Sequence, residues 1–214
     1  AAPGTGYSCN CVADLHFDIA GTCSQYLRSC KHWFQNGYTT DGVFTIQPDS
    51  SGSADAYDVW CDMTTRSGGW TGFAKRTSRS TAPLDTTSSY YTNFVNGMND
   101  YISSNNNYFL GLERMYQFST VHYNTVNMLL WFPDVGTSYY SEYTNVYMTD
   151  ANDRYRLYVT AGDSSNIGTG WTYHSGYQFT TEDSDNDDWS SGVCADGSVW
   201  GGSGFWYNNC WTVN

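Results

Sequence analysis

Short apolar runs separated by turn residues set the pattern of hydrophobic and polar positions along the chain. The run over residues 126–132 is mainly apolar and stops at Pro133, which predicts a buried strand. Residues 145–148 and 155–160 alternate between apolar and polar positions, so each is predicted to form a strand with one buried face. The second half of the chain is therefore predicted to be rich in strands.

The first half of the chain contains one strand signal, one hairpin signal and two helical segments. Residues 43–47 have a strand-like composition, and residues 62–75 are predicted to form a hairpin in which residues 66–69, Arg-Ser-Gly-Gly, make the turn. A stretch rich in Ser, Thr, Asn and Tyr is predicted to form loops around one short helix near residues 90–103. Another helical turn is predicted over residues 113–118.

Residues 29–214 contain no repeat, linker or low-complexity segment, so they are predicted to form one domain. Residues 1–28 precede this domain as a cysteine-containing extension. Within it, Cys9 and Cys11 are too close in sequence to form a comfortable disulfide with each other. We expect one of them to close a loop with Cys23. The other is expected to stay free or to link a second chain, which would make a homo-oligomer.

Composition and charge exclude several classes of function. The formal net charge is −12 with nine Lys and Arg, so the basic surface needed to bind nucleic acid or an anionic membrane is missing. No apolar run approaches the ~18 residues of a membrane span, so no membrane insertion is expected. The seven cysteines form no C-x-x-C pair of the metal or redox kind, which indicates an oxidising compartment. The start A-A-P-G-T-G-Y fits a mature terminus after signal removal, so the protein is predicted to be secreted.

An acidic run near the C-terminus is the strongest candidate for chemistry. Five of the seven residues from Glu182 to Asp188 are acidic, and there is no Lys or Arg from residue 157 to the end. Neighbouring carboxylates raise each other's pKa unless a positive charge lies among them. The alternation of Asp183, Asp185 and Asp187 with small or polar residues is typical of a loop that turns several oxygens toward Ca²⁺.

Other interpretations of the acidic run fit its residues less well than a calcium site does. The EF-hand pattern fits three positions from Asp183 but fails where Asp188 replaces Gly and where Cys194 replaces Glu. Zinc is disfavoured because no Cys or His lies inside the run. A solvated acidic turn is the simplest alternative. The closeness of Trp189 and Cys194 argues against it, since solvated acidic runs seldom carry an aromatic residue and a cysteine.

A series of ordered motifs runs along residues 29–214. In the first part of the chain they are S-C-K (29–31), T-D-G-V-F-T-I-Q-P (40–48), V-W-C-D-M-T-T (59–65) and G-G-W (68–70). Further along they are F-L-G-L-E (109–113), Y-R-L-Y-V-T-A-G-D-S (155–164), H-S-G-Y-Q-F-T-T-E-D-S-D-N-D-D-W (174–189), C-A (194–195) and F-W-Y-N-N-C (205–210). Together these motifs resemble the fibrinogen-related domains of ficolins, tachylectins and the globular ends of fibrinogen. The resemblance implies an α+β fold with a central twisted, mostly antiparallel sheet, short helices, and a loop-rich subdomain that binds calcium and ligand.

The resemblance also implies a ligand set for the ion and two disulfides. The side chains of Asp185 and Asp187 and the backbone carbonyls of Trp189 and Ser191 would bind Ca²⁺. Gly192 is the alternative to Ser191, because the loop has one more residue before the cysteine than the commonest family form. Asp183 would lie behind the ligands. The family pairs the equivalents of Cys30 with Cys61 and of Cys194 with Cys210.

A recognition pocket beside the calcium site is implied in the same way. It would include a cis peptide between Asn209 and Cys210, which costs ~3–4 kcal/mol and needs strong support from its surroundings. Aromatic side chains would line its apolar part, although each could instead be ordinary core: Trp200, Trp206, Tyr207 and Trp211. The match has two departures. Trp211 stands where the family usually has His, and the sequence stops at Asn214, before the family's S-N-L-N-G segment, so the domain is expected to be shortened.

The sequence thus predicts a secreted calcium-binding lectin that recognises carbohydrate, with N-acetyl groups as the family's typical ligand. The alternative is a structural or adhesive extracellular protein in which the domain serves subunit assembly. An innate immune role follows only from analogy with the family. Catalysis is not expected, because the four histidines lack metal-type spacing and G-x-S-x-G, P-loop and dinucleotide motifs are absent.

Overall fold

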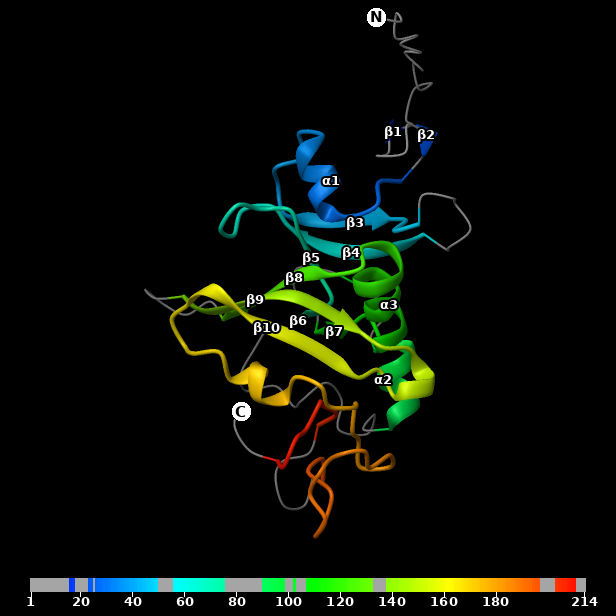
Figure 1. The fold of residues 1–214 in the computed structure, drawn as a ribbon. Coiled ribbons are helices and arrows are strands. Elements are labelled where there is room, and N and C mark those ends of the chain that lie inside the picture. The colour runs from blue at the N-terminus through cyan, green and yellow to red at the C-terminus, as the bar shows by residue number, and fades with distance from the viewer. Residues whose placement is uncertain are drawn as a thin grey trace, which may run out of the picture. The chain divides into compact units, whose positions relative to one another are not determined.

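The computed structural model divides the chain into two units (Figure 1). The first is Ala1–Phe73 with Tyr101–Asn106, and the second is Ala74–Asp100 with Asn107–Asn214. The structure describes residues 16–17, 23–24, 26–49, 56–75, 90–98, 102, 107–132, 138–196 and 203–210. The single folding domain over residues 29–214 stays a prediction. Within the described residues, no helix is both long and apolar enough to cross a membrane.

The first unit is built on a three-stranded antiparallel sheet. Its strand order is β3 (Gly42–Ile46), β4 (Tyr57–Asp62) and β5 (Trp70–Gly72), and the short helix α1 (Cys30–Gln35) contacts β5. The predicted disulfide between Cys30 and Cys61 is confirmed, with Cα atoms 5.3 Å apart. It ties α1 to the central strand. A two-stranded pair, β1 (His16–Phe17) and β2 (Cys23–Ser24), lies in the same unit.

The predicted hairpin is confirmed as far as Gly72, and two glycines explain its turn. Its predicted extension to Lys75 is wrong, because Ala74 and Lys75 pair with Phe109 and Tyr108 instead. Strand β4 pairs with β5 in the register Asp62 opposite Trp70. Gly68 and Gly69 both have left-handed backbone, with φ of 65° and 81°. A Cβ at Gly68 would collide with the backbone carbonyl of Met63, so only glycine fits there.

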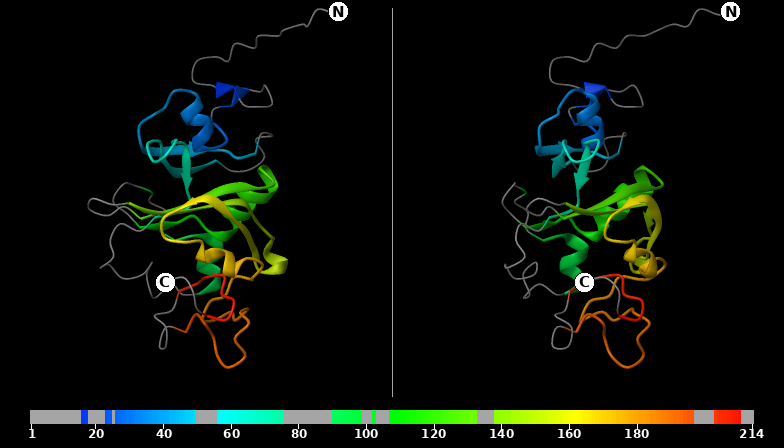
Figure 2. Two further views of the ribbon diagram at one scale, coloured as in Figure 1. Left: turned by 60° about the vertical axis from the view of Figure 1, so that its left-hand side comes forward. Right: turned by 90° about the vertical axis from the view of Figure 1, so that its left-hand side faces the viewer.

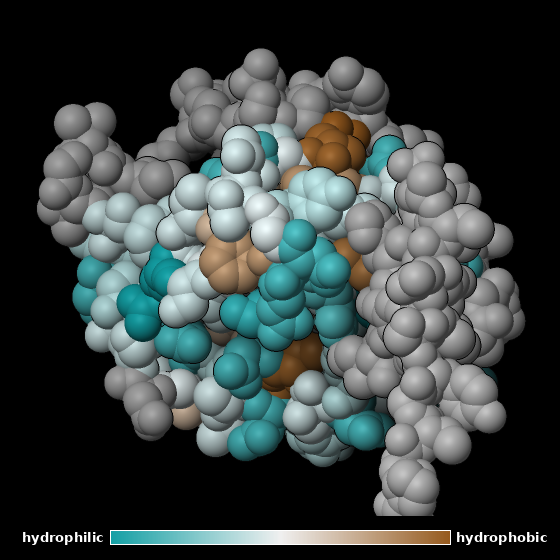
Figure 3. All heavy atoms as spheres, turned by 90° about the horizontal axis from the view of Figure 1, so that it is seen from above, coloured by the Kyte–Doolittle hydropathy of each residue, from teal (hydrophilic) through white to brown (hydrophobic). Residues whose placement is uncertain are grey.

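In the face drawn in Figure 3, small hydrophobic areas lie among hydrophilic residues wherever the surface is described.

The second unit contains a three-stranded antiparallel sheet in the order β10–β9–β8, which appears as one continuous curved layer in both views of Figure 2. Strand β8 (Val126–Phe132) has the bounds predicted from its apolar run. Strand β9 (Tyr139–Met148) begins earlier than predicted, and β10 (Leu157–Ser165) begins two residues later. The late start coincides with a turn in the backbone, because Arg154 and Tyr155 both have left-handed conformations, with φ of 54° and 51°. A small pair, β6 (Ala74–Lys75) and β7 (Tyr108–Phe109), completes the sheets of this unit.

The helices of the second unit are short. Helix α2 (Tyr91–Asn96) is shorter than the helix predicted near residues 90–103, since it ends before Gly97, whose φ is 95°. Residues 99–101 and 103 of that prediction lie outside the described residues. A Cβ on Gly97 would lie 2.7 Å from the carbonyl oxygen of Leu110, so this close approach also requires glycine. The predicted turn near residues 113–118 is confirmed as α3 (Leu112–Tyr116), which continues into a π-helix, Gln117–His122. Two 3₁₀ turns, Ala151–Asp153 and Gly170–His174, flank β10.

The core of the second unit is largely aromatic and joins the sheet to the C-terminal loops. Its buried members come from α2, α3, β9, β10 and the loops: Phe94, Leu112, Tyr143, Val146, Met148, Tyr155, Leu157, Val159, Phe179 and Trp206. Aromatic side chains bury a large area each, so a small number of them can hold loops that lack regular structure. The observed sheets and short helices confirm the predicted α+β class.

Candidate metal and ligand site

The turn between β9 and β10 holds two C-terminal loop segments of the site, one containing Phe179 and the other containing Trp206. The backbone carbonyl of Arg154 accepts a hydrogen bond from the amide of Phe179 at 2.9 Å. The carbonyl of Tyr155 accepts one from Nε1 of Trp206 at 2.7 Å. The hydroxyl of Tyr155 in turn donates to Oε2 of Glu113 in α3 at 2.8 Å. The left-handed pair at Arg154 and Tyr155 therefore presents two carbonyls to two different C-terminal loops.

A backbone bridge joins these loops to each other. Thr180 and Phe205 exchange two backbone hydrogen bonds, of 2.9 and 3.0 Å. The next residue, Trp206, is only 3 % exposed, and its ring meets that of Phe179 edge to face with centroids 4.9 Å apart. Trp206 is thus a core residue. Tyr207 is half-buried, and its hydroxyl donates to the carbonyl of Ser203 at 2.9 Å.

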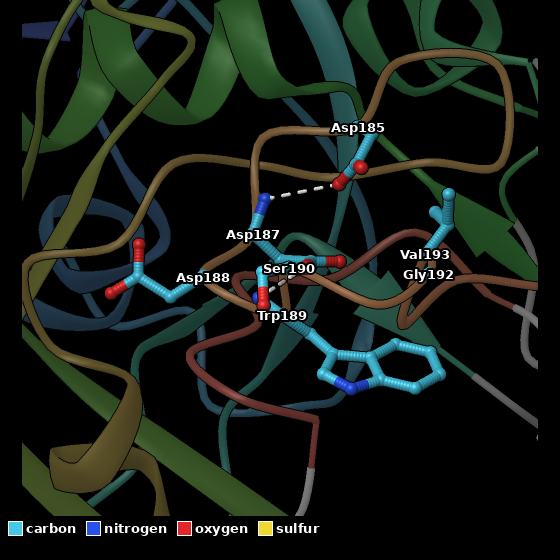
Figure 4. Close-up of a pocket in the computed structure, with 7 residues that line it drawn as sticks. All are labelled: Asp185, Asp187, Asp188, Trp189, Ser190, Gly192 and Val193. Carbon is cyan, nitrogen blue, oxygen red and sulfur yellow. Dashed lines mark hydrogen bonds between the residues drawn. The ribbon is translucent and has the colours of Figure 1, made fainter.

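The carboxylate of Asp187 is the centre of the acidic loop. Its two oxygens accept hydrogen bonds from the backbone amides of Trp189 at 2.9 Å and Cys194 at 2.8 Å. Asp185 lies next to it and accepts from the amide of Asp187 at 3.3 Å (Figure 4). Burial raises the pKa of Asp187, the two amides lower it, and the charge of Asp185 raises it again. The loop therefore holds two adjacent carboxylates in a geometry that a bound cation would favour.

Asp183 points to a different partner. Its carboxylate accepts from the backbone amide of Tyr91 at 2.8 Å and from the hydroxyl of Thr181 at 2.7 Å, so it caps the start of α2. The neighbouring Ser184 lies near the guanidinium of Arg154, with Nη1 and Oγ 3.5 Å apart. Among the described residues no group of three His, Cys, Asp or Glu side chains could hold a metal ion. A cation at Asp185 and Asp187 would accordingly need backbone carbonyls as further ligands, and carboxylate with carbonyl oxygen is the donor set that suits Ca²⁺.

A shallow surface cavity, wide open to solvent and about 470 Å³ in volume, lies beside these carboxylates (Figure 4). Its lining residues are Asp185, Asp187, Asp188, Trp189, Ser190, Gly192 and Val193. Three of the four predicted calcium ligands thus surround one space. Ser191 is exposed and is not among the lining residues, whereas its alternative Gly192 is. The choice between these two carbonyls stays a prediction.

The predicted ligand pocket is only partly described. Trp200 and Trp211 lie outside the described residues, while Tyr207, Asn209 and Cys210 are within them. The disulfide between Cys194 and Cys210 is confirmed, with Cα atoms 5.0 Å apart. The cis peptide expected between Asn209 and Cys210 is wrong, because this bond is trans. A trans bond is favoured by ~3–4 kcal/mol at a residue other than proline.

His174 is a site residue that the sequence analysis missed. It is 1 % exposed, and its Nδ1 accepts a hydrogen bond from the backbone amide of Asn208 at 3.3 Å. The carbonyl of Asn208 accepts from the amide of Asp188 at 3.0 Å, so His174 connects to the acidic loop through one residue. Burial lowers the pKa of His174, and the backbone carbonyl of Trp206 partly opposes this. Spacing along the sequence gives no signal for such a role, which depends on loops meeting in space.

Lowering the pH should reduce the stability of the folded protein through protonation of His174. Because its folded-state pKa lies below the unfolded value of ~6.5, the folded protein binds fewer protons there, and stability is lost as pH falls below that value. The urea midpoint of the wild type should drop between pH 7.5 and pH 5, and His174→Gln should drop less. Asp187, with its raised pKa, acts in the opposite direction in both proteins. An equal drop in the two proteins would exclude His174 as the cause.

Comparison with known proteins places these features in a family. A family model described as "Fibrinogen beta and gamma chains, C-terminal globular domain" matches residues 26–214. Tenascin of Gallus gallus is 30 % identical over 198 residues, which are 92 % of this chain but only 10 % of tenascin. Microfibril-associated glycoprotein 4 of Bos taurus is 30 % identical over 202 residues, covering 90 % of this chain and 72 % of that protein. The solved fibrinogen-like globe domain of human ANGPTL2 is 26 % identical with a TM-score of 0.71, and the match covers 86 % of this chain and 78 % of that one.

Proposed function

Because the chain belongs to the family of fibrinogen C-terminal globular domains, we propose that it is a secreted calcium-binding lectin that recognises carbohydrate beside the acidic loop. The observation that carries the proposal is the pair Asp185 and Asp187, which face one cavity in a region without Lys or Arg from residue 157 onward. The calcium ligands are the side chains of these two residues and the carbonyls of Trp189 and Ser191, with Gly192 as the alternative.

When bound, calcium supplies the positive charge that this part of the chain lacks. The chain's own residues then hold the loop in shape. Asp187 fixes the amides of Trp189 and Cys194. The disulfide from Cys194 continues to Cys210 in the predicted pocket. Through Cys194 and its disulfide, the acidic loop is therefore connected to the proposed sugar-binding residues. These are Trp200, Tyr207, Asn209, Cys210 and Trp211.

Two disulfides support an extracellular location, since such bonds persist in oxidising compartments. Oligomers linked through Cys9 or Cys11 would present several sites at once. Linked sites bind a multivalent glycan more strongly than one site does, because the second binding event becomes intramolecular. A weak single pocket would in this way be sufficient for function.

A structural or adhesive extracellular role is the second candidate. It is favoured by one relative, which is named as a microfibril-associated glycoprotein. In this role the domain serves subunit assembly, and calcium stabilises the fold without a sugar ligand. The two candidates differ in whether the isolated protein binds a carbohydrate.

Chromatography on immobilised sugars separates the two candidates. The lectin is expected to be retained on at least one of N-acetylglucosamine, N-acetylgalactosamine, galactose and mannose in the presence of Ca²⁺, and EDTA should release it. Retention that survives EDTA would contradict the calcium-dependent pocket. A protein that passes every column, yet melts at a higher temperature with Ca²⁺, would favour the assembly role.

A further inference from the structure

Asn186 lies between the two proposed calcium ligands Asp185 and Asp187, and its side chain is fixed by several acceptors. Its amide nitrogen donates to the backbone carbonyl of Phe179 at 2.9 Å. The same nitrogen lies 3.0 Å from the carbonyl oxygen and 3.1 Å from the hydroxyl oxygen of Ser184. Backbone carbonyls can only accept hydrogen bonds, so the group that faces them must be a donor. An asparagine amide meets this need.

The backbone of Asn186 is held by the same part of the chain. Its amide donates to Oγ1 of Thr180 at 3.0 Å. Thr180 has no exposed surface and is itself bound to Phe205 through two backbone hydrogen bonds. Both the backbone and the side chain of Asn186 are therefore attached to residues 179 and 180, which the core keeps in place.

The position of Asn186 accounts for the arrangement of its two neighbours. Asp185 and Asp187 both line the cavity, whereas Asn186 does not. An extended chain gives this alternation, because side chains two residues apart lie on the same side of it. Neighbouring carboxylates repel each other, so other contacts must keep them together before a cation binds. The contacts of Asn186 on the other side of the loop can do this.

We propose that Asn186 is a positioning residue of the calcium site, which binds no ion itself but holds Asp185 and Asp187 on one side of the loop. The inference rests on the calcium part of the proposed function and does not depend on sugar binding. Residues that orient metal ligands contribute strongly to affinity, and their loss lowers it roughly 10–100-fold. The proposal assigns such a role to a residue outside the ligand set.

Asn186→Asp is a test in which charge and position have opposite effects. The substitution keeps the size of the side chain but turns an oxygen toward the carbonyls of Phe179 and Ser184. Two acceptors cannot share a hydrogen bond, so the new carboxylate would move away from them and release the loop. The added negative charge, in contrast, would attract Ca²⁺ more strongly. Weaker calcium binding would therefore identify position as the cause.

Thr180 tests the backbone contact of Asn186 without any change of charge. Thr180→Val keeps the volume of the buried side chain but removes Oγ1, the acceptor for the amide of Asn186. Thr180→Ser keeps this oxygen. Thr180→Val should consequently weaken calcium binding more than Thr180→Ser does.

Calcium affinity is measured by isothermal titration calorimetry of Ca²⁺ into the whole, EDTA-treated chain, with circular dichroism to show that each variant is folded. Asn186→Asp is expected to raise the dissociation constant for Ca²⁺ roughly 10–100-fold, and Asn186→Ala should raise it as well. Val159→Ala is the control for a general loss of stability, since Val159 is a buried residue of β10 that does not line the cavity. It should bind Ca²⁺ as the wild type does.

Hydrogen exchange in EDTA gives a readout that does not involve calcium. The amide of Cys194 donates to Asp187, so its protection reports on the position of that carboxylate. In Asn186→Asp, the amides of residues 185–194 should exchange faster relative to those of β9. Unchanged relative exchange would show that Asn186 does not shape the loop, and the inference would fall.

Unchanged or tighter calcium binding in Asn186→Asp would overturn the inference and leave the proposed calcium site standing. An equal loss of affinity in Val159→Ala would also overturn it, because general stability would then be the cause. If Asn186→Asp does not fold, Asn186→Ala and Thr180→Val decide in the same way. A wild-type protein that binds no Ca²⁺ would overturn the calcium site and this inference together.

Discussion

Asp187→Asn is expected to abolish most of the calcium-induced rise in melting temperature. The variant keeps the shape of the side chain but removes its charge and one of the two acceptors that now hold the amides of Trp189 and Cys194. Calcium at 100 times its dissociation constant would stabilise the wild type by about 2.7 kcal/mol, which corresponds to a shift of roughly 5–10 °C for a protein of this size. Scanning calorimetry with Ca²⁺ and with EDTA measures the shift directly.

Glu182→Gln is the matched control for Asp187→Asn. Glu182 belongs to the same acidic run but is exposed and does not line the cavity. Removing its charge should leave most of the calcium-induced shift in place, because exposed charges are screened by solvent and salt. If Asp187→Asn retained the full shift, calcium would have to bind elsewhere, and the proposed ligand set would fall.

Trp206→Ala is expected to have the largest effect on stability, a loss of about 3–5 kcal/mol. Trp206 is 3 % exposed and packs against Phe179, so its removal leaves a cavity in the aromatic core. It also leaves the carbonyl of Tyr155 without the 2.7 Å hydrogen bond from Nε1. A buried acceptor without a partner adds to the cost. Urea unfolding followed by circular dichroism measures the change in the free energy of unfolding.

Trp206→Phe separates the two contributions. It keeps an aromatic ring and loses the hydrogen bond, so its loss of stability should lie between those of the wild type and Trp206→Ala. Val121→Ala, at a side chain that is 51 % exposed, should change the stability by less than ~0.5 kcal/mol. A Trp206→Ala protein with wild-type stability would show that the contact between the C-terminal segment and the sheet does not hold the unit together.

Local patterns predicted those elements whose cause is local. The apolar run of β8 ends at its proline, and the glycines at 68 and 69 make the turn of the first unit's hairpin. The end of α2 and the late start of β10 were missed. Both depend on left-handed backbone, at Gly97 in one case and at Arg154 and Tyr155 in the other. Positive φ at an arginine and a tyrosine has no sequence signal, and here it accompanies hydrogen bonds that the two carbonyls accept from residues far along the chain.

In the candidate site, too, the sequence predicted the features that arise from nearby residues and missed those that arise from distant ones. The alternation of aspartates predicted that carboxylates gather at one point, and Asp185 and Asp187 do line one cavity. Spacing could not show that Asp183 turns away to cap α2, because Tyr91 is 92 residues distant in sequence. It also could not show that His174 is buried beside the segment that follows Trp206. These depend on how loops fold over each other.

The disulfide between Cys194 and Cys210 has a mechanical consequence. A force applied to the chain beyond Cys210 would pass through the disulfide to Cys194. The segment between the two cysteines, which are 16 residues apart in sequence, would carry little of that force. The amide of Cys194 is bound to Asp187, so tension would reach the carboxylate at the centre of the acidic loop within one residue. Traction on this part of the molecule would thus act on the proposed metal ligands before it acts on the sheet.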